Sequence, residues 1–189
     1  MPKRPGLNLD RIVEASLELI QQRGEQALTF AALADHFGVR PPSLYNHVRG
    51  VEALRRELRL RGLRQLHGRL LTAGAGRSAF EALVALSHAY RQFAQEQPAL
   101  YRMTLASTEQ DDAELKAAGR DCLDVILMIL RGYRLEGEQA LHATRCLRSA
   151  LHGFVSLEIE GGFAMPLDLD DSFELLIRQQ DTFLKTGDF

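Results

Sequence analysis

Residues 29 to 50 read TFAALADHFGVRPPSLYNHVRG, and this stretch decides the fold because it predicts two short helices joined by a tight corner. Thr29 is the expected N-cap of the first helix, and Gly38 follows it where a left-handed residue lets the chain turn out of the helix. Apolar residues recur between them at spacings of three and four, which places them on one buried face. These residues are Phe30, Leu33, Ala34 and Phe37.

The second helix of the pair is expected to begin at Pro42. A proline restricts the residue before it to extended backbone, so Arg40 and Pro41 are both expected to be non-helical. Pro42 suits the first helical position because the amide hydrogen it lacks would have had no partner there. At about 100° per residue, Leu44 and Val48 point to one side of this helix. The opposite, polar side carries Ser43, Asn46 and His47.

Two helices that meet at a turn of three or four residues, with polar groups facing outward from the second, have the layout of a helix-turn-helix motif. In that motif the second helix enters the major groove of DNA. The same spacing also fits an ordinary helical hairpin in a bundle, since Gly-Val corners are common there. The spacing by itself leaves both interpretations open.

Residues 9 to 55 resemble the N-terminal domain of the tetracycline-repressor (TetR) family of bacterial transcription regulators. The resemblance rests on three runs, RIVEASLELIQQRG, LTFAALADHFGV and PPSLYNHVRGVEAL. It implies an all-α protein with a three-helix DNA-binding domain and a larger helical bundle for effector binding and dimerisation. Members often carry a lysine where this chain has Val51, so a phosphate contact would fall instead to Arg49, Arg55 or Arg56.

The candidate DNA contacts follow from the chemistry of the side chains. The amide of Asn46 can pair with adenine N6 and N7, and the hydroxyl of Ser43 can meet either type of base pair. Arg40 can read guanine or hold a phosphate. The contacts that would position phosphates are assigned to Thr29, Tyr45, His47 and Arg49, and Pro41 completes the set.

The charge distribution agrees with a DNA-binding N-terminal part. The net charge is −2 overall, yet residues 1 to 71 hold 12 Lys and Arg against 7 Asp and Glu, while the remaining 118 residues hold 11 against 18. A basic end suits neutralisation of phosphates, although a solvated helix face could show the same bias. Residues 1 to 8 are expected to form an arm in which Lys3 and Arg4 reach DNA, or a disordered tip.

Composition is that of a soluble globular protein, at 46% hydrophobic and 25% charged residues. The longest apolar run, Val125 to Leu130, is too short to span a bilayer, and no apolar segment that would mark a secretion signal follows the basic N-terminus. Cys122 and Cys146 are both expected to be small buried hydrophobes in a reducing cytosol.

The rest of the chain predicts helices throughout, and no sustained strand pattern interrupts them. A connecting helix is expected over residues 51 to 71, followed by a Gly-rich linker at 72 to 78. Further helices are expected from about residue 80 to 93, from Pro98, and over residues 112 to 131, 137 to 160 and 169 to 185. The expected domains are therefore residues 1 to 50 for DNA and 51 to 189 for effector and partner.

The resemblance also implies that the last two helices pair with those of a second subunit. The expected interface residues are Leu147, Leu151, Phe154, Phe173, Ile177 and Leu184. The run Ala150 to Phe154, with Gly161 to Phe163, is similar to one subgroup of the family named for a Trp-His-Gly signature, although the tryptophan is absent here. An apolar or aromatic effector would contact Phe80, Tyr90, Phe93, Tyr101, Met103 and Met128, residues that plain core packing would also explain.

Neither a metal site nor an enzyme is expected. Glu138 and His142 share a helix face, and His88 and His152 add two possible ligands, but the paired Glu-x-x-His of di-metal bundles is missing. No Gly-x-Ser-x-Gly elbow is present. The sequence thus favours a homodimeric, ligand-responsive repressor of a palindromic operator that needs no cofactor. The alternative is a helical ligand carrier of the same fold without DNA binding, which absence of the outward polar residues at 40 to 49 would have favoured.

Overall fold

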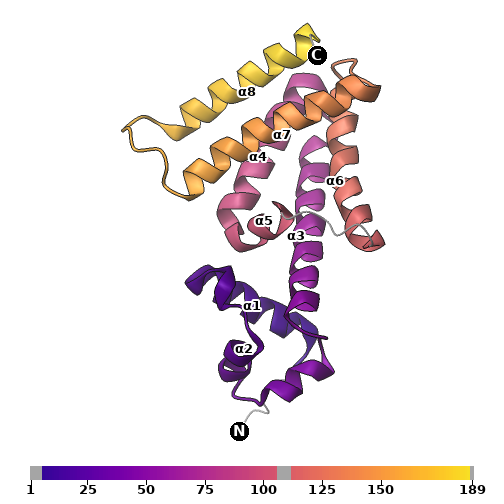
Figure 1. The fold of residues 1–189 in the computed structure, drawn as a ribbon. Helices are drawn as coiled ribbons and strands as arrows, with labels where there is room; N and C mark the ends of the chain where they lie inside the picture. Colours follow the sequence, from indigo (N-terminus) through magenta and orange to yellow (C-terminus); the bar gives the residue numbers. More distant parts are fainter. Residues whose placement is uncertain (1–5, 106–111, 188–189) are drawn as a thin grey trace. The chain divides into compact units, whose positions relative to one another are not determined.

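The computed structural model describes residues 6–105 and 112–187, and these residues form helices and connecting turns without any strand (Figure 1). Lys3 and Arg4 lie outside the described residues. The chain divides into two compact units, Met1–Gly62 with Ala99–Ser107, and Leu63–Pro98 with Thr108–Phe189. The all-α prediction is therefore confirmed, and the domain boundary expected at residue 50 stays a prediction.

The first unit begins with α1, Leu9–Arg23, and the 3₁₀ turn η1, Glu25–Ala27. The Asn8 side chain accepts a hydrogen bond from the Arg11 amide at 2.9 Å and so caps the N-terminus of α1. Gly24, at φ +81°, ends the helix where the sequence predicts. Helix α2, Phe30–Phe37, contacts α1 and the 3₁₀ segment η2, Pro41–Asn46. The core of this unit includes the fully buried side chains Ile12, Leu33, Leu44, Leu54 and Leu58.

Helix α3, Val51–Gly74, begins in the first unit and continues into the second. The prediction of a linker from residue 72 is wrong for its first three residues. Thr72 donates its hydroxyl to the Gly68 carbonyl at 2.8 Å within the helix, and a Cβ at Gly74 would lie 3.6 Å from Cδ1 of Ile129, so the helix continues for three residues with one tertiary contact at its end.

Helix α5, Pro98–Leu105, belongs to the first unit and lies close to α3 at Gly62. A Cβ atom at Gly62 would lie 2.9 Å from Cγ2 of Thr104 and 3.0 Å from the carbonyl oxygen of Leu100. Glycine at this buried position therefore permits the two backbones to approach closely.

The second unit is built around α4, Ala79–Glu96, which contacts α6, Ala113–Arg131, α7, Gly137–Ile159, and α8, Leu169–Thr186 (Figure 1). These helices agree with the predicted ranges to within two or three residues. Their apolar stripes meet in a core that includes Leu83, Phe93, Leu130, Val155, Phe173 and Ile177, all fully buried.

A buried arginine joins three of these helices. Arg91 on α4 donates from Nε to Glu158 of α7 at 2.8 Å and pairs through Nη1 with Asp170 of α8 at 2.8 Å. Its guanidinium also lies 4.8 Å from the centre of the Phe173 ring. The hydrogen bond with Glu158 is the main cause that raises the pKa of Arg91 above its usual value. The ion pairs thus compensate a charge inside an apolar core.

The two cysteines differ in solvent exposure, so the prediction that both are buried is wrong for one of them. Cys122 is buried and donates its thiol to the Leu63 carbonyl at 3.4 Å, and burial raises its pKa to about 11. Cys146 is exposed because it lies on the outward side of α7, opposite the buried residues of that helix. Among residues 6–105 and 112–187, no helix combines the length and hydropathy that a membrane span requires.

Candidate DNA-binding site

The predicted corner between the two short helices is present. The Thr29 hydroxyl oxygen accepts from the Ala32 amide at 3.1 Å, which confirms Thr29 as the N-cap of α2. Gly38 has φ +65° and ψ 35°, a left-handed conformation that suits glycine. The Val39 amide then donates to the Ala34 carbonyl at 2.9 Å, so the backbone groups at the helix end are paired as the chain turns.

The second helix differs in type from the prediction. Arg40 is extended, with φ −82° and ψ 144°, as expected, but the helical segment η2 begins at Pro41, one residue earlier than predicted, and it is a 3₁₀ helix. Its first hydrogen bond runs from the Ser43 amide to the Arg40 carbonyl at 2.9 Å. Pro41 and Pro42 both precede this bond, at positions where a helix needs no amide donor, so two prolines can open the segment.

The two predicted faces of this segment are confirmed by burial. Leu44 is fully buried and Val48 nearly so, and both help to hold the segment against the rest of the first unit. The remaining side chains face solvent or are half-buried. Those exposed are Arg40, Pro41, Asn46, His47 and Arg49, and Ser43 is half-buried. The polar groups assigned to DNA thus share one accessible segment.

Tyr45 combines packing with exposure. Its ring lies edge-on to Phe30 of α2, with centroids 4.7 Å apart and an interplanar angle of 62°. Yet 59% of Tyr45 remains exposed. Such a ring is fixed in orientation by its aromatic neighbour and leaves a phenol hydroxyl available for a hydrogen bond.

The structure distinguishes the three arginines that could replace the missing lysine contact at Val51. Arg55 pairs with Glu52 at 3.1 Å and with Glu25 at 3.6 Å, and Arg56 pairs with Glu57 at 3.2 Å. Arg49 is exposed and forms no ion pair with any residue in the described ranges. Its guanidinium is therefore the most accessible of the three for a phosphate.

The six predicted effector contacts fall in both units. Tyr90 and Phe93 are buried in the second unit, whereas Phe80 and Met128 of the same unit are exposed. Tyr101 and Met103 are buried residues of α5 and belong to the first unit. The second unit therefore groups only four of the six residues, and their role in ligand binding stays a prediction.

Five of the six predicted dimer residues are packed inside the single chain. Leu147, Leu151, Phe173, Ile177 and Leu184 are each at most 2% exposed, because they lie on the faces of α7 and α8 that contact the rest of the second unit. A role of the six residues in an interface stays a prediction, and α7, α8 and their connecting loop also expose large apolar side chains. The most exposed of these are Met165 at 76%, Leu167 at 70% and Leu175 at 67%.

The histidines that could have suggested a metal site have other neighbours. His88 lies 2.7 Å from Glu174, and His152 lies 3.2 Å from the Ser156 hydroxyl. Within the described part of the chain, no three His, Cys, Asp or Glu side chains are grouped so that they could hold a metal ion.

Comparison with known proteins agrees with this geometry. The profile of bacterial regulatory proteins of the tetR family matches residues 12–58, and that of the tetracyclin repressor-like C-terminal domain matches residues 83–180. The uncharacterized HTH-type transcriptional regulator YobS of Bacillus subtilis is 39% identical over 97% of this chain and 94% of its own. A second uncharacterized HTH-type regulator, Rv0681 of Mycobacterium tuberculosis, is 40% identical over 82% of this chain and 72% of its own.

A solved structure shows the same fold over nearly the whole chain. A variant of TetR from Acinetobacter baumannii AYE, crystallised in complex with minocycline, has a TM-score of 0.71 at 20% identity and covers 96% of this chain and 98% of its own. The resemblance to the Trp-His-Gly subgroup stays a prediction.

Proposed function

Because this chain belongs to the tetR family of bacterial regulatory proteins and is a transcriptional regulator, we propose that it binds a palindromic operator as a homodimer and responds to a small-molecule effector. The observation that carries this proposal is the accessible polar side of η2. Asn46 and the following residue His47 are exposed there, while Leu44, and Val48 just beyond the end of η2, anchor the opposite side. This arrangement lets the segment present hydrogen-bonding groups to a groove without disturbing the core.

In this proposal Asn46 reads an adenine, Ser43 contacts a neighbouring base, and Arg40 reads guanine or holds a phosphate. Thr29, Tyr45, His47 and Arg49 position the phosphates, with Pro41 beside them. The accessibility of Arg49 supports its assignment in place of the absent lysine. Together these contacts give a sequence-independent affinity and a smaller, sequence-dependent preference.

A homodimer is supported by the apolar surface of α7, α8 and their loop. Large side chains such as Met165, Leu167 and Leu175 are mostly exposed in the single chain. Burial of such side chains against a partner is favourable, and a two-fold axis lets one surface cover its own copy. A dimer would also carry two copies of η2. A palindromic operator needs two such copies, one for each of its half-sites about one helical turn apart.

Effector binding is supported by likeness to the Acinetobacter TetR variant, whose structure holds minocycline. The proposed effector binds the second unit, near Tyr90 and Phe93. Its binding shifts the population towards dimers in which the two copies of η2 no longer match the spacing of the two half-sites. Helix α3 transmits the shift, since it is shared by both units. The alternative of a ligand carrier without DNA binding is not favoured by the exposed polar residues of η2.

The proposal is tested by a gel shift with the DNA upstream of the protein's own gene, combined with sedimentation of the complex. We expect a retarded band that scrambled DNA does not compete away, and two protomers for each bound duplex. Failure to shift any duplex while a small molecule still binds would favour the ligand carrier instead.

A further inference from the structure

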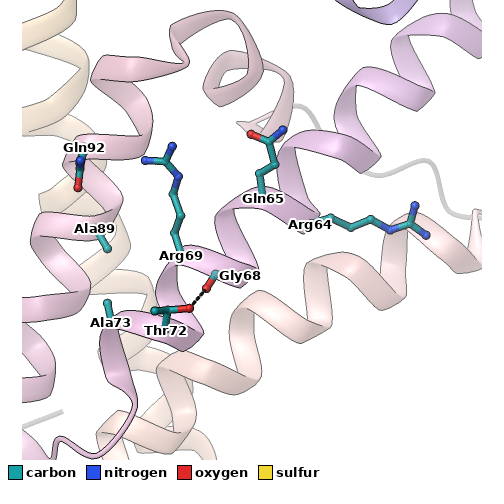
Figure 2. A pocket seen from close by; sticks show the side chains of 8 residues that line it. All are labelled: Arg64, Gln65, Gly68, Arg69, Thr72, Ala73, Ala89 and Gln92. Carbon is teal, nitrogen blue, oxygen red and sulfur yellow. Dashed lines mark hydrogen bonds between the residues drawn. The ribbon is translucent and has the colours of Figure 1, made fainter. Parts of the chain in front are cut away.

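A shallow, solvent-facing cavity of about 710 Å³ lies between α3 and α4 in the second unit, and all its lining residues are exposed or half-buried (Figure 2). Its volume is in the range of about 300 to 1,000 Å³ that small-molecule sites usually have. Small residues form much of its wall, namely Gly68, Ala73 and Ala89. A Cβ at Gly68 would meet no atom within 4 Å, so the space above this helix surface is free. None of the six residues assigned above to an effector lines this cavity.

The cavity also has a cation at its edge. Arg69 rises from α3 into the space beside α4, where Figure 2 shows it between Gln92 and Gln65. Its guanidinium lies 5.5 Å from the centre of the buried Phe93 ring, and it pairs with Glu96 at 2.7 Å. The aromatic ring and the carboxylate therefore orient this half-buried side chain at the edge of the cavity.

The same carboxylate also positions a second donor. Glu96 accepts a hydrogen bond from the Gln92 amide at 2.6 Å. The hydrogen bond with Arg69, followed by that with Gln92, lowers the pKa of Glu96 below its usual value, so the group that aligns both side chains stays ionised. Two donors from neighbouring helices thus meet at one edge of the cavity.

Arg69 and Gln92 keep free hydrogen-bond donors after these interactions with Glu96. A guanidinium carries five N–H donors and a primary amide two, so donors remain for a ligand. The Arg69 and Glu96 side chains are 32% and 45% exposed, and an ion pair this hydrated is weak enough to rearrange around a bound anion. Arg64 is turned away from Arg69 and pairs with Glu114 at 2.7 Å.

We propose that this cavity binds a small organic anion whose carboxylate is held by Arg69 and Gln92 while its apolar body lies against Gly68, Ala73 and Ala89. Glu96 contacts both donors without lining the cavity, so the carboxylate of the ligand would replace Glu96 as the partner of Arg69. A planar carboxylate matches the fork of the guanidinium better than a neutral amide does. The site is independent of DNA binding, and its lining does not include Tyr90 or Phe93, where the effector of the proposed function binds.

Benzoate is the probe, and benzamide is its neutral counterpart of the same shape. Ligand-observed NMR titrations at constant ionic strength are expected to show saturable binding of benzoate and at least tenfold weaker binding of benzamide, as loss of a charge-assisted hydrogen bond implies. Arg69→Gln is expected to weaken benzoate binding about tenfold or more, and Gln92→Ala to weaken it by a smaller factor. Arg178→Gln, which removes an exposed arginine of α8 outside the cavity, is the control and is expected to change nothing.

Three results would overturn the proposed site: no saturable binding of benzoate, equal binding of benzoate and benzamide, or equal effects of Arg69→Gln and Arg178→Gln. Circular dichroism checks that each variant is folded, and Gln92→Ala provides the decisive comparison if Arg69→Gln unfolds. Because the titration contains no DNA, its failure leaves the proposed regulator intact. Conversely, a protein that binds benzoate through Arg69 but shifts no duplex would contradict the regulator and not the anion site.

Discussion

The ring of Tyr45 in η2 packs edge-on against the ring of Phe30 in α2, with ring centroids 4.7 Å apart. This contact orients the Tyr45 hydroxyl. Two substitutions can therefore separate the contribution of the ring to stability from the contribution of the hydroxyl to DNA affinity. Tyr45→Phe is expected to leave the free energy of unfolding unchanged but to lower affinity for every duplex about threefold to tenfold, since one hydrogen bond is lost. Tyr45→Ala should in addition lower the free energy of unfolding by about 0.5–1.5 kcal/mol. Urea unfolding and fluorescence anisotropy measure the two effects; unchanged DNA affinity in Tyr45→Phe would remove the hydroxyl from the interface.

Two glycines of α3 should respond oppositely to the same substitution. At Gly62 an added methyl group would lie 3.0 Å from the Leu100 carbonyl, so Gly62→Ala is expected to lower the free energy of unfolding by about 1–3 kcal/mol. Gly68→Ala meets open space and should raise it by about 0.5–1 kcal/mol, because alanine favours the helix. Urea unfolding of both variants measures this, and a gain of stability in both would show that α5 does not pack closely on Gly62.

Arg91 is expected to be the most sensitive charged position in the second unit. Arg91→Met leaves Glu158, whose side chain is only 12% exposed, without its partner, and should lower the free energy of unfolding by about 3–5 kcal/mol. Adding Glu158→Gln should recover part of this loss, since the buried charge is then removed. Arg64→Met, which breaks a pair with Glu114 in which the two side chains are 63% and 48% exposed, is the control and should cost less than about 1 kcal/mol. Equal losses in the two single variants would contradict a buried ionic network.

The two thiols should differ in reactivity and in their linkage to pH. A thiol reagent at pH 8 is expected to modify one cysteine per native chain, Cys146, and both cysteines after unfolding in guanidinium. The pKa of Cys122 is raised by burial from 9.0 to about 11, so the unfolded state loses this proton first. Stability should therefore fall by about 2–3 kcal/mol as pH rises from about 9 to about 11. Cys122→Ala should flatten this decline; an identical decline in that variant would exclude Cys122 as its source.

The features that could be predicted from the sequence are those set by local apolar periodicity and by helix-capping residues. The Thr29 cap, the left-handed Gly38 and the buried pair Leu44 and Val48 follow from spacing and side-chain chemistry alone, and the structure confirms them. The 3₁₀ form of η2 escaped prediction, since a helix of either type has the same start signal in two prolines. The network around Arg91 has no signal in the sequence either, because its partners are 67 and 79 residues away and only tertiary packing brings them together.

The residues predicted for the dimer interface illustrate what an apolar stripe leaves open. An apolar stripe shows that a helix has a buried face, but it does not tell whether the covering residues come from the same chain or from a copy. Phe173 and Ile177 are covered by their own chain, whereas Leu175, between them in sequence, points outward. Helices with apolar residues on two sides, such as α8, therefore require the structure to tell the two faces apart.

The central claim, that Asn46 reads a base while Arg49 holds a phosphate, is tested most directly by fluorescence anisotropy with two labelled duplexes. One is the sequence that the wild-type protein selects from random DNA, and the other has the same composition in scrambled order. Asn46→Ala is expected to lose about 1–3 kcal/mol of preference for the selected duplex and little affinity for the scrambled one. Arg49→Ala is expected to weaken binding to both duplexes equally and to reduce the slope of the salt dependence by about one. If Asn46→Ala instead weakened binding to both duplexes by the same factor, or changed neither, the exposed polar side of η2 would not be the surface that reads DNA.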